Sequence, residues 1–269
     1  MRVLGIVGSG RDGNTLELTE NILQRMERYA TAYGQEFEGE ILKLKDLELP
    51  LCRSCHNCAT EKGEKYCPHR EIVAQVEEKI QAADGIILAS PVSSLQVTGL
   101  MKNLIDHFSF YFHRPRLFDK YGLALTNTAG ARHKASGRYL QSVLHAWGIG
   151  KPQILPLMLA NVKVVMDNKM DRRLERAARK FYFQISHRKA SSPSLYDIIY
   201  YSVWRGFIST GSSEEADYDY WQKRGWLDQS YYYTSGVNPV KLAIGGLFYR
   251  FLRRTFAKQQ AQNERIEKP

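Results

Sequence analysis

Apolar residues in the N-terminal part of the chain form short continuous runs that alternate with longer stretches of helical spacing. Residues 3–7 are apolar or glycine throughout, which predicts a buried strand. The apolar side chains of residues 15–33 recur every three to four positions, which predicts an amphipathic helix. The runs that predict further strands are residues 37–44, 85–89, 121–126 and either 154–159 or 162–166. The stretches that predict further helices are residues 72–80, 98–108, 138–147 and 170–185.

Five strand–helix units in alternation predict an α/β fold with a doubly wound, five-stranded parallel sheet of flavodoxin type. In such a sheet a ligand binds at the carboxyl ends of the strands. The run at residues 85–89 supports this, because a parallel strand covered on both faces is apolar at every position. The alternation stops near residue 186, and Ser191-Ser192-Pro193 favours a linker. We therefore predict a flavodoxin-like domain over residues 1–188 and a mostly helical, aromatic-rich extension over residues 189–269.

The extension concentrates large aromatic side chains, which we expect to pack on the main domain or on a partner subunit rather than to stack on substrate. They are Tyr200, Tyr201, Trp204, Phe207, Tyr218, Tyr220, Trp221, Trp226, Tyr231, Tyr232 and Tyr233.

The end of the extension predicts a basic amphipathic helix over residues 238–258. Asn238 can cap it, with Pro239 at its first position. One apolar face is predicted from Val240, Ile244, Leu247, Phe248, Phe251 and Leu252, with Arg250, Arg253, Arg254 and Lys258 largely outside it. Such a helix docks on its own domain or on a neighbouring subunit, or it makes peripheral contact with a membrane surface.

The glycine-bearing turn at residues 8–15 joins the first strand to the first helix. Successive backbone N–H groups, the helix dipole and the side chains of Ser9, Asn14 and Thr15 together predict a phosphate site. Asn14 can cap the helix reciprocally with Glu17. The turn has neither a Walker loop nor a G-x-G-x-x-G motif, which disfavours ATP and dinucleotides and favours the phosphate of FMN. An ordinary tight turn is the alternative.

Composition narrows the class of protein. The chain has 269 residues, of which 43% are hydrophobic, and a net charge of +10. No apolar run approaches the roughly 20 residues of a membrane span, and no signal-peptide pattern opens the chain, so we expect a cytoplasmic protein. The charge suits anionic ligands, and no nucleic-acid motif accompanies it.

All four cysteines of the chain lie in one predicted loop over residues 45–69, in the pattern C-x2-C-x2-C-x8-C with a proline after the last. They are Cys52, Cys55, Cys58 and Cys67. Cysteines at this spacing in a cytosolic protein favour metal binding or redox chemistry over structural disulfides. A 4Fe–4S cluster is the first interpretation. Structural zinc, with His56 and His69 as competing ligands, a redox disulfide and free thiols are the alternatives.

Three further motifs accompany the cysteines. They are G-S-x-R-x-x-N-T at residues 8–15, A-D-G-I-I-L-A-S-P-V at residues 83–92 and T-x-x-M-K-N-L-I-D at residues 98–106. The combination, over roughly residues 1–150, resembles the flavodoxin-like NAD(P)H-dependent FMN reductases and their iron–sulfur flavoprotein branch. The chain departs from that pattern at Ser93, where the branch has tyrosine, and in a longer gap before Cys67. The serine implies a more open flavin face.

The resemblance implies a set of site residues. The residues expected to bind the FMN phosphate are Ser9, Arg11, Gly13, Asn14 and Thr15. The residues expected to bind the isoalloxazine ring and the ribityl chain are Ser90, Pro91, Val92, Ser93, Ser94, Thr126, Asn127, Thr128, Ala129 and Gly130. Backbone N–H groups near Ser93 and Gly130 are expected to bond the polar edge of the flavin, with Arg132 and His133 close by. The four cysteines hold the cluster. Lys102 and Asp106 form a surface pair, and His107 stands where arginine is common.

The function implied is that of an FMN-dependent oxidoreductase in which the flavin passes electrons to an iron–sulfur cluster. No catalytic side chain is expected, because the cofactors carry the chemistry. One alternative is a cluster-free NAD(P)H-dependent FMN or quinone reductase, and another is a zinc-stabilised flavodoxin-like binding module without turnover. NAD(P)H is the expected electron donor. The expected partners are a redox protein or small-molecule acceptor and further copies of the chain, but not nucleic acid.

Overall fold

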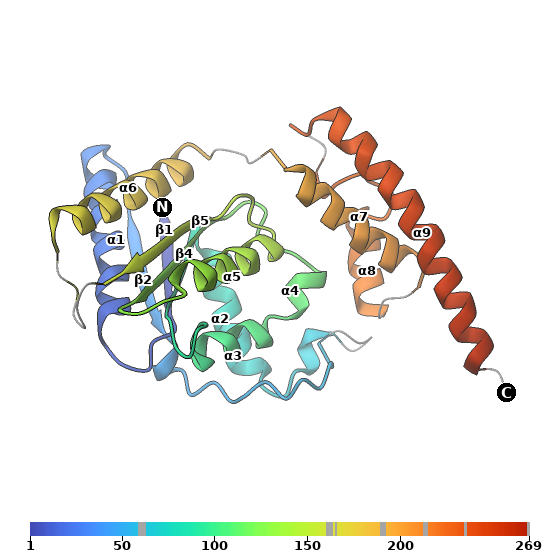
Figure 1. Cartoon of the computed structure of the whole chain (residues 1–269), viewed down its shortest axis with the longest axis horizontal. Helices are drawn as coiled ribbons and strands as arrows, with labels where there is room; N and C mark the ends of the chain where they lie inside the picture. The colour runs from blue at the N-terminus through green and yellow to red at the C-terminus, as the bar shows by residue number, and fades with distance from the viewer. Residues whose placement is uncertain are drawn as a thin grey trace. The chain divides into compact units, whose positions relative to one another are not determined.

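The computed structural model describes residues 1–58, 63–159, 164, 166–188, 192–211, 215–233 and 236–267. The chain divides into two compact units (Figure 1). The first comprises residues 1–54 and 69–190, and the second comprises residues 55–68 and 191–269. Residues 55–68, which carry three of the four cysteines, thus group with the C-terminal unit, whereas the predicted first domain includes the whole cysteine loop.

The first unit is built on a five-stranded parallel sheet with the order β2-β1-β3-β4-β5. Its strands are β1 (Arg2–Val7), β2 (Glu38–Lys43), β3 (Gly85–Pro91), β4 (Tyr121–Thr128) and β5 (Gln153–Met158). This confirms the flavodoxin-like prediction. The fifth strand is the first of the two predicted choices. Most of the other choice, residues 162, 163 and 165, lies outside the described residues.

Helices cover both faces of this sheet. Helices α1 (Asn14–Ala32) and α6 (Asn168–Ser186) share one hydrophobic core with β1, β3, β4 and β5. On the opposite face α5 (His133–Ala146) packs on β4 and β5, and α3 (Gly99–His107) packs beside the end of β1. The remaining elements of this unit are α2 (Arg70–Ala82), α4 (Phe110–His113) and the short 3-10 helix η1 (Leu44–Asp46).

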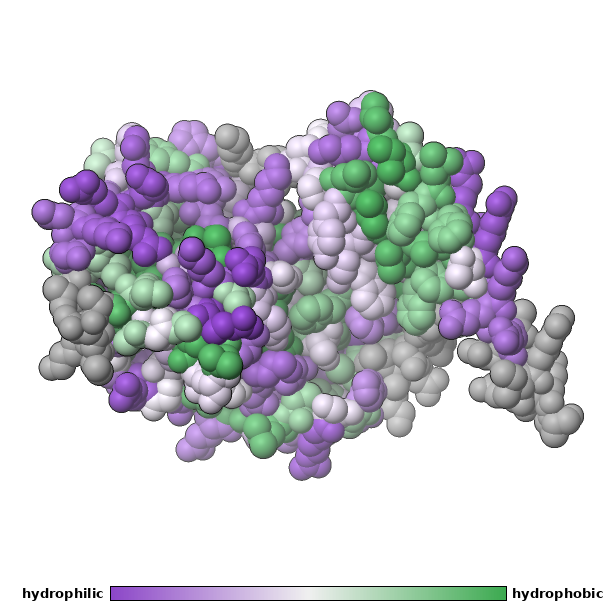
Figure 2. Space-filling view, in the orientation of Figure 1, coloured by the Kyte–Doolittle hydropathy of each residue, from purple (hydrophilic) through white to green (hydrophobic). Residues whose placement is uncertain are grey.

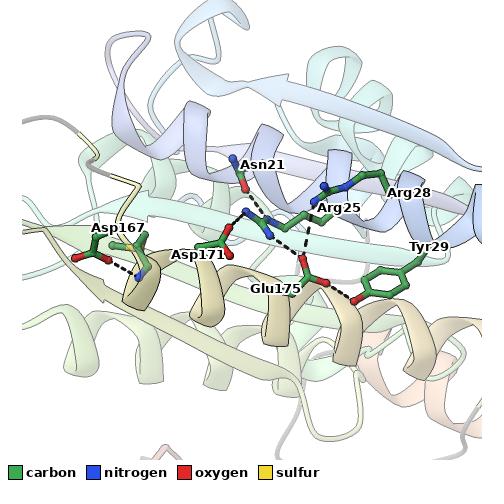
Figure 3. A network of polar contacts seen from close by, with 8 residues as sticks. Asn21, Arg25, Arg28, Tyr29, Asp167, Asp171 and Glu175 are labelled. Atoms are coloured by element: carbon green, nitrogen blue, oxygen red, sulfur yellow. Dashed lines mark hydrogen bonds and ion pairs between the residues drawn. The ribbon is translucent and has the colours of Figure 1, made fainter.

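A polar network ties α1 to α6 along the edge of that core (Figure 3). The side chain of Arg25 is only 9% exposed, and its guanidinium donates to Asp171 at 2.7 Å and to Glu175 at 2.6 Å. Its Nε donates to Asn21 at 2.7 Å. Tyr29 also donates to Glu175. Because α1 begins at the predicted phosphate turn, this network holds the helix whose first residues form that turn.

The second unit contains η2 (Glu64–Tyr66), α7 (Leu195–Ser209), α8 (Glu215–Lys223) and α9 (Pro239–Glu267). Helices α7 and α9 lie side by side (Figure 1). They approach closely at Gly245, where a Cβ atom would lie 2.4 Å from Ile198 Cγ2. The helix start is confirmed, since Asn238 Oδ1 accepts from the N–H of Val240 at 2.9 Å. Within the part of the chain that the structure describes, every helix is too short or too polar to span a bilayer.

Aromatic side chains form the core of this second unit. Tyr201 and Trp221 are fully buried and stack at a ring-centroid distance of 5.4 Å, and Trp226 and Tyr232 pack around them. The Tyr201 hydroxyl donates to the carbonyl of Trp226 at 2.5 Å. Many of the aromatics that the sequence analysis assigned to a contact with the main domain or a partner therefore fill the interior of their own unit.

Candidate functional site

The predicted phosphate turn starts at a glycine that no other residue can replace without rearrangement. A Cβ atom at Gly8 would lie 2.8 Å from Met101 Cβ of α3, closer than carbon atoms normally approach. Its N–H donates to the carbonyl of Ala89 at 2.8 Å, and its carbonyl accepts from Thr98 Oγ1 at 2.5 Å. The turn is thereby fixed against both β3 and α3.

Helix α1 begins differently from the prediction. Its N-cap is Gly13 rather than Asn14, and among the described residues no side-chain cap hydrogen bond is found there, so the reciprocal cap between Asn14 and Glu17 is wrong. Asn14 Oδ1 instead accepts from the N–H of Val164 at 3.2 Å. A Cβ atom at Gly10 or Gly13 would meet nothing within 4 Å. A helix start without a side-chain cap, bordered by open space at two glycines, suits a bound phosphate.

The two hydroxyls predicted to serve this site are engaged within the protein. Ser9 is 7% exposed, and its Oγ donates to the carbonyl of Arg11 at 2.7 Å. Thr15 is buried, and its Oγ1 donates to Asn127 Oδ1 at 2.8 Å. In this conformation both side chains therefore shape the turn, and its backbone N–H groups and the exposed side chain of Arg11 are donors that it can offer to an anion.

Asn127 joins the three loops that the sequence analysis assigned to the flavin. Its side chain accepts from Thr15 in the first loop, and its carbonyl accepts from the N–H of Val92 in the second at 2.9 Å. It also pairs with Pro91 in the register of β3 and β4. The structure thus brings residues from the ends of β1, β3 and β4 together at the carboxyl edge of the sheet, as a flavodoxin-like fold requires.

The two backbone N–H groups named for the flavin edge already have partners. The N–H of Ser93 donates to the carbonyl of Gln96 at 2.8 Å, and that of Gly130 donates to Thr128 Oγ1 at 3.0 Å. Between residues 93 and 96 the chain turns through two left-handed positions, Ser94 with φ 46° and Leu95 with φ 72°. Non-glycine residues rarely adopt such angles outside functional loops and tight turns.

Two polar atoms at the start of α5 are buried without a partner among the described residues. They are His133 Nδ1 and Ser136 Oγ. The carbonyl of His133 accepts from Thr126 Oγ1 at 2.8 Å, which places this imidazole beside the end of β4. Burial, reinforced by Lys134 and Arg173, lowers the pKa of His133. A neutral imidazole with an unsatisfied nitrogen next to the predicted ring site is a suitable partner for a polar ligand atom.

Helix α3 holds the chain immediately before the cysteines. Asn103 is 8% exposed, and its Oδ1 accepts from the N–H of Cys52 at 2.9 Å. Its Nδ2 donates to the carbonyls of Leu49 at 3.2 Å and Pro50 at 3.0 Å. His107, 4% exposed, donates from Nε2 to the same Pro50 carbonyl at 2.9 Å. Sequence reasoning placed this helix in a family motif but missed its contact with the first cysteine.

The cysteines are divided between the two units. Cys52 belongs to the first, and Cys55, Cys58 and Cys67 belong to the second. None of the four is in a disulfide. Among the described residues, which omit 59–62 of this segment, no three His, Cys, Asp or Glu side chains are grouped as metal ligands. Four thiols in one short segment remain a donor set of the kind that iron–sulfur clusters and zinc both accept.

Two histidines of the first unit contact each other, His69, which follows Cys67 closely in the sequence, and His107 on α3. The rings of His69 and His107 meet edge to face with centroids 5.5 Å apart. Burial, together with the charges of His107 and Arg53, lowers the pKa of His69.

The surface pair of Lys102 and Asp106 is confirmed as an ion pair on the outer side of α3.

Comparison with known proteins identifies the family. The family model described as NADPH-dependent FMN reductase matches residues 1–156. The chain belongs to this family. An iron–sulfur flavoprotein from Archaeoglobus fulgidus is 30% identical over 234 residues, which cover 84% of this chain and 100% of that protein. An iron–sulfur flavoprotein from Methanocaldococcus jannaschii is 37% identical over 107 residues, or 39% of this chain and 51% of its own length.

Solved structures agree in fold. An oxidoreductase from Corynebacterium diphtheriae gives a TM-score of 0.53 at 18% identity, covering 70% of this chain and 98% of its own. The apo form of an NADH:FMN oxidoreductase gives a TM-score of 0.50 at 19% identity. The match covers 68% of this chain and 89% of that chain. At such identities the likeness concerns the fold alone. The family match confirms the prediction that this FMN reductase family member is a flavin-dependent oxidoreductase.

Proposed function

We propose that this oxidoreductase binds FMN across the three loops at the carboxyl edge of its sheet and passes electrons between FMN and an iron–sulfur cluster held by its four cysteines. The observation that carries the FMN site is the contact of Thr15 with Asn127, which unites the first and third loops, while Val92 attaches the second to the same residue. Bound FMN supplies two-electron and one-electron chemistry, and a 4Fe–4S cluster supplies a one-electron acceptor.

The residues of the chain act by binding and orientation. The backbone N–H groups of residues 9–15 and the start of α1 bind the phosphate. Ser9 and Thr15 shape that turn through their bonds to Arg11 and Asn127. The loop at residues 90–95 and the end of β4 border the ring, with His133 Nδ1 as a further polar contact. Ser93, being small, leaves the ring accessible to NAD(P)H as donor.

Cys52, Cys55, Cys58 and Cys67 are the proposed cluster ligands. Support comes from the chemistry of the donor set, from the names of the relatives and from the fixed position of Cys52 beside α3. The cluster would then pass electrons to a redox protein or a small-molecule acceptor. We also propose that the protein works as a homo-oligomer.

An absorption spectrum and metal analysis of protein purified without oxygen test this function. We expect bound flavin, a broad visible absorption beneath the flavin bands, and about four iron and four sulfide per chain. Flavin without iron would leave a cluster-free FMN or quinone reductase. Stoichiometric zinc would contradict the cluster, and absence of both flavin and iron would contradict the proposal as a whole.

Single substitutions then test the ligands. Cys58→Ala is expected to remove the cluster iron and leave FMN bound, because the cysteine segment and the phosphate turn are separate elements. Arg53→Ala, at an exposed position of the same segment, is the matched control and should keep both cofactors. Full iron content in Cys58→Ala would contradict this ligand set.

A further inference from the structure

Helix α9 has two apolar faces, and among the described residues one of them packs within its unit while the other is exposed. The inner face packs on α7, where Gly245 lies against Ile198, and Leu252 and Phe256 lie against Gly206. The aromatic rings of Phe207 and Phe256 meet at 5.8 Å. The single stripe predicted from the sequence is therefore divided, because Leu252 and Phe248 turn partly inward.

The outer face exposes the rest of that stripe. Val240, Ile244, Leu247 and Phe251 follow one another at spacings of four, three and four residues, which aligns them along one side of a helix. Their exposed fractions are 66%, 41%, 63% and 64%. Figure 2 shows an apolar green surface over this region with purple polar residues beside it. We call these four residues the α9 stripe.

The segment of the chain that carries the α9 stripe has basic residues and no acidic ones. The chain contains no acidic residue between Asp228 and Glu264, whereas Lys241, Arg250, Arg253, Arg254 and Lys258 lie in that interval. Arg250, Arg254 and Lys258 are exposed on α9, and among the described residues none of them forms a salt bridge. An apolar row bordered by exposed cations is complementary to a partner surface whose interior is apolar and whose outer layer carries negative charge.

That match distinguishes between the occupants of the stripe. A second copy stacked on the same stripe would bring the cations of residues 241–258 together, and that interval contains no acidic residue to neutralise them, which opposes self-association through the stripe. A bilayer containing anionic lipid accepts apolar side chains at the level of its headgroups and attracts the flanking cations. We propose that the α9 stripe attaches this oxidoreductase to anionic membrane surfaces, with α9 lying in the plane of the interface.

Vesicle sedimentation of the full-length, FMN-loaded protein tests the proposal. We expect binding to vesicles of phosphatidylcholine with phosphatidylglycerol, little binding to phosphatidylcholine alone, and weaker binding as salt is raised. The double variant Leu247→Ser/Phe251→Ser should bind on the order of a hundredfold more weakly, because two buried apolar contacts are lost. Both side chains are mostly exposed, so the variant should fold, and unchanged FMN content and circular dichroism check this.

Two matched variants separate α9 from the rest of the surface. Tyr33→Ser removes a side chain that is 61% exposed on the first unit, and it should leave vesicle binding unchanged. Arg250→Gln/Arg254→Gln should weaken binding about twenty-fivefold, at about fivefold for each of the two charges near the membrane. Arg172→Gln/Arg176→Gln removes the same number of positive charges from exposed positions of α6, and it should have little effect on vesicle binding.

The outcomes decide the proposal directly. Vesicle binding that is lost with the α9 stripe and kept in the two control variants supports it. No binding of the wild type to anionic vesicles overturns it, and so does equal binding by Leu247→Ser/Phe251→Ser. A wild-type dimer that this variant converts to a monomer, without vesicle binding, would assign the stripe to contact between copies and would also overturn the proposal.

Discussion

Replacing Arg25 by methionine should weaken the polar contact between the two helices that cover one face of the sheet. The guanidinium is nearly buried and donates three hydrogen bonds, two to carboxylates of α6 and one to Asn21 of α1 (Figure 3). Methionine keeps most of the aliphatic volume but none of the donors. The variant therefore tests the polar contact between α1 and α6 with little change in packing.

The expected cost follows from the exposure of the partners. A hydrogen bond to a charged group contributes about 1.5–3 kcal/mol when both groups are buried. Here Asp171 is 51% exposed and Glu175 is 38% exposed, so both carboxylates regain water when the arginine is removed. We therefore expect a loss of about 2 kcal/mol in the free energy of unfolding, well below the sum of three buried bonds.

Urea unfolding of the FMN-free protein, followed by far-ultraviolet circular dichroism, measures this loss. Arg28→Met is the matched control, because Arg28 is 70% exposed and lies 3.8 Å from the same Glu175, and it should cost less than about 0.5 kcal/mol. Equal stability of Arg25→Met and the wild type would refute the reasoning, as would equal losses in the two variants.

The same network has a pH signature. A hydrogen bond from Tyr29, followed by those from Arg25, lowers the pKa of Glu175 below its ordinary value of 4.5. A carboxyl group with a lowered pKa in the folded state stabilises the fold above its ordinary pKa, and this stabilisation is lost as the pH falls through the lowered value. The stability difference between wild type and Arg25→Met should therefore shrink as the pH falls below about 4.5.

Three further expectations concern the site and the assembly. Thr15→Val removes the bond to Asn127, and Asn14→Ala removes the bond to Val164; each should weaken FMN binding about tenfold in a fluorescence titration, and wild-type affinity in both would contradict the phosphate turn. Asn103→Ala should speed hydrogen exchange at the N–H of Cys52 at least about tenfold and lower the iron content, whereas unchanged exchange would mean that Asn103 does not hold this segment. The FMN-loaded protein should sediment as a dimer or tetramer at micromolar concentration, and a monomer would contradict the oligomer.

Local sequence determined much of the first unit. The apolar run of β3 and the helical spacing of α1 depend only on neighbouring residues, because strand and helix periods are properties of a single element. The order of these elements restricts the fold to a parallel sheet with its site at one edge. The cap at Asn238 was predicted for the same reason, since a cap involves residues within one helical turn.

Tertiary structure alone decided which distant groups meet. Thr15 and Asn127 are 112 residues apart, and Cys52 and Asn103 are 51 apart, so no local pattern could pair them. The failed cap at Asn14 has the same origin, because its side chain bonds Val164 instead of its own helix. On α9, helical spacing identified the apolar residues, but only packing against α7 selected which remain exposed. A periodic sequence pattern shows which side chains of a helix are apolar. Whether such a side chain is buried depends on which other parts of the folded chain pack on it.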